Sequence, residues 1–475
     1  ESLSFPKQID LKKNKIHIAH NSLARFTQGT SKEQAIDYFK TMRSYDELTR
    51  PLLGRYRIKN GKKALEKDLA SAFYPMYGWG YGRSQAYRQS SIQGSLFKLV
   101  TAYEAMIQRF HKMGKKIITP QDLNPLVIID EVFHLGNNIY VGYTEDGKPI
   151  PQVYKGGRLP RSLAHKGREK VDLMRALEIS SNPYFALLAG ECLESPDDLS
   201  KAAQLFSFGK RTGIDLPGEI AGKVPQDLST NRTGLYAMAI GQHSLVVTPL
   251  QTAVMLAAIA NGGKILKPKI VKMTAGRHLS KSEDQIICLP TFPFQHPLSL
   301  VGIDFPLFSS LSHREQESCV KEIPTEVRSE VFMPDVVRQV LLRGLQLVTK
   351  RAHQESMSSL LRLYKQCPDA IRDFTELKED LLGKTSTSES VENIDLDLND
   401  GTNIYTHVWF GSIAFEEKHK QKNKALLLMK DEFGRPELIV VVYLRYGGYG
   451  KEAAPLAAQI VKKWREIKRK HENIR

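Results

Sequence analysis

Hydrophobic residues recur at helical spacing over some stretches of the chain and alternate with polar residues over others. Residues 95–110, SLFKLVTAYEAMIQRF, are apolar on nearly every side, which predicts a buried helix rather than an amphipathic surface helix. Residues 138–154 alternate around Asp146-Gly147 and predict a β-hairpin. From residue 171 to 261 the pattern is mostly helical, with one turn-rich interruption, GKRTGIDLPGEIAG.

The last third of the chain changes from helix to strand. A helical pattern runs from Pro334 to about Leu382, and three strand candidates follow around LLGKTST, THVWFGSIAF and ELIVVVYLRY. A further helix is predicted from Ala453. Because the connections between these strands are too short for crossover helices, we expect antiparallel pairing and an α+β fold class.

The chain divides into an N-terminal stretch and one main domain. Residues 1–62 are Lys-rich and polar, and we interpret them as an N-terminal extension or the remnant of a preceding domain. Residues 63–475 form the main domain, in which 273–330 lack clear periodicity and predict an inserted loop or small lobe. No apolar run approaches the roughly 20 residues that span a bilayer. The chain begins at Glu1, so any targeting or anchoring segment is expected upstream.

Charge narrows the partners only slightly. The 68 Lys and Arg residues exceed the 52 Asp and Glu residues by 16, which permits attraction to nucleic acid, anionic lipid or an anionic polymer. Basic residues concentrate only in the final VKKWREIKRKHENIR, which we interpret as a solvated helix face. No nucleic-acid-binding signature accompanies it, so we expect no nucleic-acid partner.

Cysteine and histidine spacing gives no sign of a metal site or a cofactor. The four cysteines, Cys192, Cys288, Cys319 and Cys367, stand far apart, and no His-x-x-x-His spacing occurs among the 13 histidines. We therefore predict neither metal nor cofactor.

The pair Ser95 and Lys98, in GSLFK, is the first candidate for chemistry. Residues three apart share a helix face, so Ser95 Oγ and Lys98 Nζ can meet. Burial lowers a lysine pKa, and a neutral lysine can activate a serine as a nucleophile. Ser-x-x-Lys recurs at Ser4, Ser207 and Ser318, but only Ser95 opens a buried helix, whose N-terminal N–H groups can serve a developing oxyanion.

A second candidate is SSNPYFALLA, in which Ser180 and Asn182 begin another predicted helix. Their hydroxyl and amide can line one pocket wall, or they can simply cap the helix. A rival Ser-x-Asn begins at Ser229 in a polar turn, and we expect no comparably apolar helix directly behind it.

The third candidate, LLGKTSTS, is not a phosphate-binding loop. Lys378 occupies the position where such a loop needs a glycine, and a charged, helix-like segment precedes it. On a strand, Thr385 and Thr387 share one face while Lys384 and Ser386 share the other. Two hydroxyls with a cation nearby form a good seat for a carboxylate.

These three elements in this order resemble the active-site set of serine penicillin-recognising enzymes. Four further segments resemble the corresponding parts of class B penicillin-binding proteins, most closely the elongation-type branch. They are residues 234–271, FGKRTGIDLPGE, THVWFGSIAF and GGYGKEAAPLAAQIVKKW. The resemblance covers roughly Gly94 to Trp464. It implies a penicillin-binding transpeptidase fold, related to β-lactamases, with a five-stranded antiparallel sheet flanked by helices.

The resemblance also implies a reaction, D,D-transpeptidation of peptidoglycan stem peptides. Ser95 would attack the carbonyl between two terminal D-alanines, and Lys98 would take its proton while Lys384 keeps Lys98 neutral. Ser180 would relay a proton to the leaving amine and Asn182 would hold the substrate amide. The N–H groups of Ser95 and Thr387 would form the oxyanion hole, and Thr385 and Thr387 would bind the terminal carboxylate.

Partners and location follow from the same resemblance. The expected partners are donor and acceptor stem peptides, β-lactam antibiotics, a membrane glycosyltransferase and other proteins of the elongation complex. The expected location is the periplasmic side of the inner membrane in the cell envelope, with the anchor in a segment absent from this chain.

Two residues depart from the family pattern. Ser386 stands where the third motif normally ends in glycine, and SSIQ rather than the usual proline precedes GSLFK. We expect a slightly wider or re-hydrogen-bonded contact between strand and helix at Ser386, with activity retained. The alternatives are a penicillin-binding scaffold or sensor whose site Ser386 has weakened, and a serine β-lactamase, for which no deacylating base is identifiable.

Overall fold

The computed structural model describes residues 84–114, 117–162, 169–277, 318–355, 368–391, 404–416, 433–444 and 450–472. The described residues up to Pro268 and from Thr325 onward belong to one compact unit, and those of Lys269–Pro324 belong to a second. The expectations for residues 1–62 lie outside the described residues. Of the inserted stretch, the second unit contains a strand pair, β10 (Met273–Arg277) with β11 (Ser318–Glu322).

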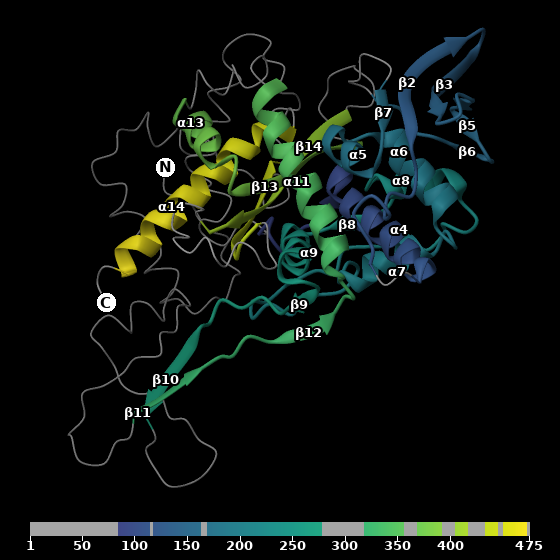
Figure 1. Ribbon diagram of the computed structural model, residues 1–475. Helices are drawn as coiled ribbons and strands as arrows, with labels where there is room; N and C mark the ends of the chain where they lie inside the picture. The colour runs from purple at the N-terminus through teal and green to yellow at the C-terminus, as the bar shows by residue number, and fades with distance from the viewer. Residues whose placement is uncertain are drawn as a thin grey trace, which may run out of the picture. The chain divides into compact units, whose positions relative to one another are not determined.

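A three-stranded antiparallel sheet forms the centre of the larger unit (Figure 1). Its strands are β13 (Leu381–Val391), β14 (Ile404–Phe415) and β15 (Pro436–Leu444), in that order. Lys384 lies opposite Gly411, and Ser386 lies opposite Trp409. The three predicted strands, their antiparallel pairing and the α+β class are confirmed, whereas the count of five strands stays a prediction.

Helices cover this sheet on both faces. On one face, α13 (Pro368–Leu377) and α14 (Ala454–Glu472) pack side by side against the sheet (Figure 1). Small residues on α14, Ala457 and Ala458, let the helix approach Phe410 of β14 closely in a common apolar cluster. On the other face, α9 (Pro249–Asn261) contacts β14 and β15 and connects the sheet to the helical region.

The helical region consists of further helices packed around one buried helix. They are α5 (Leu173–Ile179), α6 (Asn182–Leu187), the π-helical turn η3 (Leu188–Cys192), α7 (Asp198–Leu205), α8 (Arg232–Ala239) and α11 (Asp335–Glu355). The buried helix is α4 (Lys98–Met113), which ends at left-handed Gly114. A 3₁₀ turn, η2 (Gly94–Leu96), precedes it, so the predicted helix starts three residues later than expected and Ser95 lies in that turn.

A second sheet carries the predicted hairpin. Its order is β4-β3-β2-β7, with β2 (Ile128–Leu135), β3 (Asn138–Thr144), β4 (Pro149–Pro151) and β7 (Glu169–Val171). The Gly147 N–H donates to the Thr144 carbonyl at 2.9 Å, which confirms the turn. Shorter pairs are β1 (Ser91–Ile92) with β8 (Val246–Val247), β5 (Val153–Tyr154) with β6 (Gly157–Arg158), and β9 (Lys264–Leu266) with β12 (Val327–Glu330).

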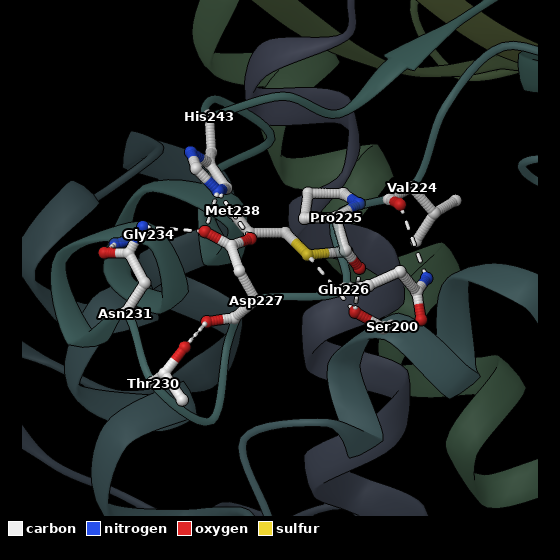
Figure 2. Close-up of polar contacts among 10 residues, drawn as sticks. All are labelled: Ser200, Val224, Pro225, Gln226, Asp227, Thr230, Asn231, Gly234, Met238 and His243. Atoms are coloured by element: carbon white, nitrogen blue, oxygen red, sulfur yellow. Dashed lines mark hydrogen bonds and ion pairs between the residues drawn. The ribbon is translucent and has the colours of Figure 1, made fainter.

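The expectation about the rival Ser229 motif is wrong. Helix α8 follows it directly and buries Leu235 and Tyr236. Asn231 caps α8 by accepting the Gly234 N–H, as Figure 2 shows. The polar residues of this turn include the start of a helix, because asparagine is favoured at the N-cap position, where its side-chain oxygen accepts a backbone N–H.

The turn after α8 is held by a hydrogen bond between His243 and Asp227. His243, at a positive φ of 63°, places Nε2 3.0 Å from Asp227 Oδ1 (Figure 2). Asp227 lies in the loop before α8, so the pair connects the two ends of that helix.

Within the described residues, no helix is both long and apolar enough to cross a membrane.

Arg338 on α11 caps the C-terminal end of α9. Its side chain is buried, and its guanidinium donates to the carbonyls of Ile259 and Ala260, the latter at 2.9 Å from Nη2. These are orphan carbonyls of the last helical turn, for which an arginine is a suitable donor. We predict that Arg338→Met, which keeps most of the volume, lowers the free energy of unfolding by about 2 kcal/mol in a urea titration.

The matched control is Arg372→Met on α13, whose side chain is 62% exposed and pairs only at the surface. It should change the free energy of unfolding by less than about 0.5 kcal/mol. Equal effects of the two substitutions would contradict the capping role of Arg338.

Candidate active site

The turn before α4 packs directly against strand β13. Gly94 has a φ of 62°, and its N–H donates to the Gly241 carbonyl at 2.8 Å. A Cβ at Gly94 would overlap Ser386 Oγ and lie 3.3 Å from the Thr387 carbonyl oxygen, so only glycine permits this approach. Ser95, the predicted nucleophile, follows at once and is held near the backbone of Thr387, its predicted partner in the oxyanion hole.

Lys98 is fully buried and is engaged by the Ser-Ser-Asn segment. Its Nζ lies 2.7 Å from the Ser180 carbonyl oxygen, 3.1 Å from Ser180 Oγ and 2.7 Å from Asn182 Oδ1. These acceptors match the three hydrogens of an ammonium group. Among the described residues Ser95 Oγ has no hydrogen-bond partner, so the expected Ser95–Lys98 bond is not formed in this structure. Lys98 must release a proton before its lone pair can turn to Ser95.

The surroundings of Lys98 favour that release. Burial holds the pKa of Lys98 well below its ordinary value of 10.5, and the positive charge of Lys384 lowers this pKa further. The carboxylate of Asp130 acts in the opposite direction and raises it. The predicted effect of Lys384 on Lys98 therefore has the expected sign, although burial is the larger cause.

Ser180 lies between the two lysines. It ends α5 in the left-handed conformation, at a φ of 60°. This conformation turns its hydroxyl toward both amines: Lys384 Nζ lies 2.9 Å from Ser180 Oγ and Lys98 Nζ lies 3.1 Å from it. Ser180 thus joins three elements that are far apart in the sequence, α4, the α5–α6 turn and β13. It is well placed to pass a proton between a lysine and a bound substrate.

Lys384 is also fully buried, and burial lowers its pKa from 10.5 to about 7. Besides Ser180, its Nζ donates to the carbonyl oxygen of Thr385 at 3.1 Å. Two lysines that share one hydroxyl in an apolar interior cannot both hold a proton cheaply. The site is consequently poised for proton transfer near neutral pH.

Side chains alternate along β13 as predicted. Lys384, Ser386 and Ser388 are buried, whereas Thr385 is half-buried and Thr387 is exposed. Ser386 Oγ donates to the Gln93 carbonyl at 2.8 Å, so the predicted re-hydrogen-bonded contact is confirmed. Ser386 therefore faces the turn before α4 and leaves the Thr385–Thr387 face unchanged.

Four residues of this region were not predicted from the sequence as site residues: Gly94, Gly241, Gly450 and Asp130. Gly94 and Gly241 permit the close approach of the turn to β13, and Gly450 donates its N–H to Thr387 Oγ1 at 3.1 Å. The signal for the glycines was present in GSLFK, GQH and GYG, where a glycine in or beside a turn marks a backbone contact. Among the described residues, no group of three or more His, Cys, Asp or Glu side chains could hold a metal ion.

Comparison with known proteins connects this geometry to a family. Residues 154–422, more than half of the chain, match the penicillin-binding protein transpeptidase domain. This range includes Ser180, Asn182 and Lys384, whereas Ser95 and Lys98 precede it.

Curated relatives match over shorter segments. Peptidoglycan D,D-transpeptidase MrdA of Acinetobacter baumannii is 31% identical over 124 residues, which cover 24% of this chain and 18% of that protein. Penicillin-binding protein PbpB of Mycobacterium tuberculosis is 40% identical over 158 residues, which cover 33% of this chain and 20% of that protein. The matched segments thus span about a fifth of the length of these relatives. A solved transpeptidase domain, that of penicillin-binding protein 3 from Burkholderia pseudomallei, is 16% identical with a TM-score of 0.46, over 81% of this chain and 82% of that one.

The burial of Lys384 predicts a pH-dependent stability. Between pH 7 and 10.5 the unfolded chain binds a proton at this lysine and the folded chain does not, so the folded state gains stability as the pH rises through this range. We expect Lys384→Met to stabilise the protein at pH 7 by up to roughly 4 kcal/mol. This advantage should shrink toward pH 10 in urea titrations at a series of pH values. A difference that does not change with pH would show that Lys384 keeps its ordinary pKa in the folded state.

Proposed function

Because the chain belongs to the penicillin-binding protein transpeptidase family, we propose that it is a peptidoglycan D,D-transpeptidase that works through an acyl-enzyme on Ser95. One observation supports this proposal above the others. Lys98, Ser180, Asn182 and Lys384, which come from three separate motifs, meet in one buried hydrogen-bonded group. Helix-capping or surface roles for these motifs do not require that convergence.

The first half of the reaction forms the acyl-enzyme. Ser95 Oγ attacks the carbonyl carbon between two terminal D-alanines, and its proton passes to the neutral amine of Lys98. The N–H groups of Ser95 and Thr387 stabilise the oxyanion of the tetrahedral intermediate. The C–N bond then breaks, and the proton returns from Lys98 through the Ser180 hydroxyl to the leaving amine of D-alanine.

The second half transfers the acyl group. An amine of a second stem peptide attacks the ester carbon and loses a proton to the same lysine–serine pair. As the ester C–O bond breaks and the new amide forms, Lys98 returns that proton to Ser95 Oγ. Asn182 holds the backbone amide of the donor peptide in both halves, and Thr385 and Thr387 bind its terminal carboxylate in the first half, before D-alanine leaves. Lys384, whose Nζ lies 2.9 Å from Ser180 Oγ, helps to keep Lys98 neutral by lowering its pKa.

Partners and location follow from the same proposal. Beyond donor and acceptor stem peptides, β-lactams are proposed to acylate Ser95 because they present a reactive amide to the same nucleophile. A membrane glycosyltransferase and elongation-complex proteins are the proposed partners. The proposed location is the periplasmic side of the inner membrane, where the substrate lies.

A non-catalytic penicillin-binding scaffold is the second candidate. It draws on one observation, that the Ser95 hydroxyl is not hydrogen-bonded to Lys98 in this structure. Ser386, the departure that first suggested it, points away from the carboxylate seat and so gives it no support.

Labelling with a fluorescent penicillin tests the proposed function. We expect a long-lived adduct on Ser95, located by mass spectrometry, and its loss in Ser95→Ala. The matched control is Ser207→Ala, which removes the serine of a second Ser-x-x-Lys in the same chain and should leave labelling intact. An unlabelled wild-type protein would favour the scaffold, and rapid turnover of the adduct would indicate a β-lactamase.

Substitution of Ser386 tests whether the departure from the family pattern matters. Ser386→Gly removes the bond to the Gln93 carbonyl but leaves Thr385 and Thr387 in place. Its second-order rate constant for penicillin acylation should therefore stay within about tenfold of wild type, roughly 1.4 kcal/mol of barrier. A much larger gain in rate would mean that Ser386 suppresses the site.

A further inference from the structure

We propose that Asp130, on β2, is a positioning residue for acyl transfer, which sets the turn that carries Ser180 and Asn182 through two serine hydroxyls. This inference rests on the proposed function. Asp130 lies outside all three motifs, 50 residues before Ser180 in the chain, and the fold brings it beneath the α5–α6 turn.

The Asp130 side chain is buried, with an exposed fraction of only 2%. Its Oδ2 accepts two hydroxyl groups, Ser181 Oγ at 2.5 Å and Ser162 Oγ at 2.9 Å. A carboxylate is acceptor-only and each serine has a single hydroxyl hydrogen. Both hydrogens are therefore committed to Asp130.

Because both hydroxyl hydrogens bond to Asp130, the two serine oxygens can act only as acceptors toward the backbone. Ser162 Oγ accepts the Asn182 N–H and Ser181 Oγ accepts the Tyr184 N–H, both at 3.3 Å. Two backbone N–H groups in the first turn of α6 are thereby held to one carboxylate. Charge-assisted bonds of this kind are the stronger ones in proteins, so the orientation of this turn depends on Asp130.

The positioning extends to the catalytic amine. The Asn182 side chain is fixed at both ends, with Nδ2 donating to the Arg161 carbonyl at 3.0 Å and Oδ1 accepting from Lys98 at 2.7 Å. A turn that shifted by a few tenths of an ångström would break this geometry. Asp130 thus acts on Lys98 through Ser162 and Asn182 without touching it.

A capping role alone does not account for a carboxylate here. The other oxygen, Oδ1, is buried and has no hydrogen-bond partner among the described residues. A buried, unpartnered carboxylate oxygen costs stability, and a neutral side chain could receive a serine hydroxyl at lower cost. The charge itself is therefore the useful feature. Among the charged groups that act on Lys98, Asp130 from β2 opposes Lys384 from β13, so it keeps the pKa of Lys98 from falling even further.

The test uses the full chain and a fluorescent penicillin, with the second-order acylation rate constant measured against pH. Asp130→Asn should lower the plateau rate at least tenfold, because the neutral amide oxygen of asparagine holds the two hydroxyls more weakly than a carboxylate oxygen does. It should also move the acidic limb of the profile to lower pH, since loss of the negative charge lowers the pKa of Lys98. Thermal unfolding of each variant provides the folded fraction.

Two variants of Ser162 separate position from charge. Ser162→Ala breaks the link to Asn182 and should lower the plateau without moving the acidic limb, because Asp130 keeps its charge. Ser162→Thr retains the hydroxyl and should restore most of the rate. These variants also decide the matter if Asp130→Asn fails to fold.

Glu219 supplies a matched control. It is a second buried carboxylate, which accepts the Thr212 and Gly213 N–H groups and the Thr212 hydroxyl away from the site. Glu219→Gln should lower the melting temperature and leave the rate profile of the folded protein unchanged.

The outcomes are distinguishable. The inference is overturned if Asp130→Asn behaves like Glu219→Gln, or if Ser162→Ala keeps the wild-type plateau. The proposed function survives either result, because the wild-type adduct on Ser95 is measured in the same experiment. A wild-type chain that forms no adduct would overturn both.

Discussion

The Ser180 hydroxyl, shared by two fully buried lysines, connects the three elements that form the site. Placing two amines in an apolar interior is costly, and it is tolerated only where both can become neutral and every hydrogen finds an acceptor. Lys98 and Lys384 meet these conditions at Ser180, Asn182 and the carbonyl of Thr385. The same conditions produce a base and a proton relay, so the cost in stability and the proposed catalytic capacity have one physical source.

The fold can be understood as the means of bringing those groups together. The α4 helix supplies Lys98 from one side and β13 supplies Lys384 from the other, and glycines allow the two elements to approach. Gly94 fits against β13, and its N–H donates to the carbonyl of Gly241, which lies in the turn after α8. His243 lies two residues after Gly241 in that turn, and its hydrogen bond to Asp227 connects the turn to the loop before α8. Positions remote from the chemistry therefore contribute to where Ser95 lies.

Sequence patterns predicted the parts of this site that depend on local geometry. Alternation along LLGKTSTS assigned Lys384 and Ser386 to one face, and the burial of both agrees. Helical spacing indicated that Ser95 and Lys98 belong together, but it could not show that a 3₁₀ turn precedes the helix or that Lys98 turns to Ser180 instead. The role of Asp130 could not be predicted from the sequence, because a single residue on a strand gives no sign of a hydrogen-bond partner some 50 positions away.

Ser386 shows why a departure from a family pattern needs its three-dimensional neighbours before it is interpreted as a defect. By sequence alone, a hydroxymethyl group in place of glycine should push β13 away from the turn before α4. The space it needs is supplied by Gly94, which has no Cβ to meet Ser386 Oγ. The acceptor of the Ser386 hydroxyl is the main-chain carbonyl of Gln93, in the unusual SSIQ segment, so the bond does not depend on the glutamine side chain. Ser386 and the SSIQ segment therefore meet in one hydrogen bond that joins strand and turn. This bond lies on the side of β13 opposite to the carboxylate seat. The serine is better understood as a second way to close this contact than as a loss of the site.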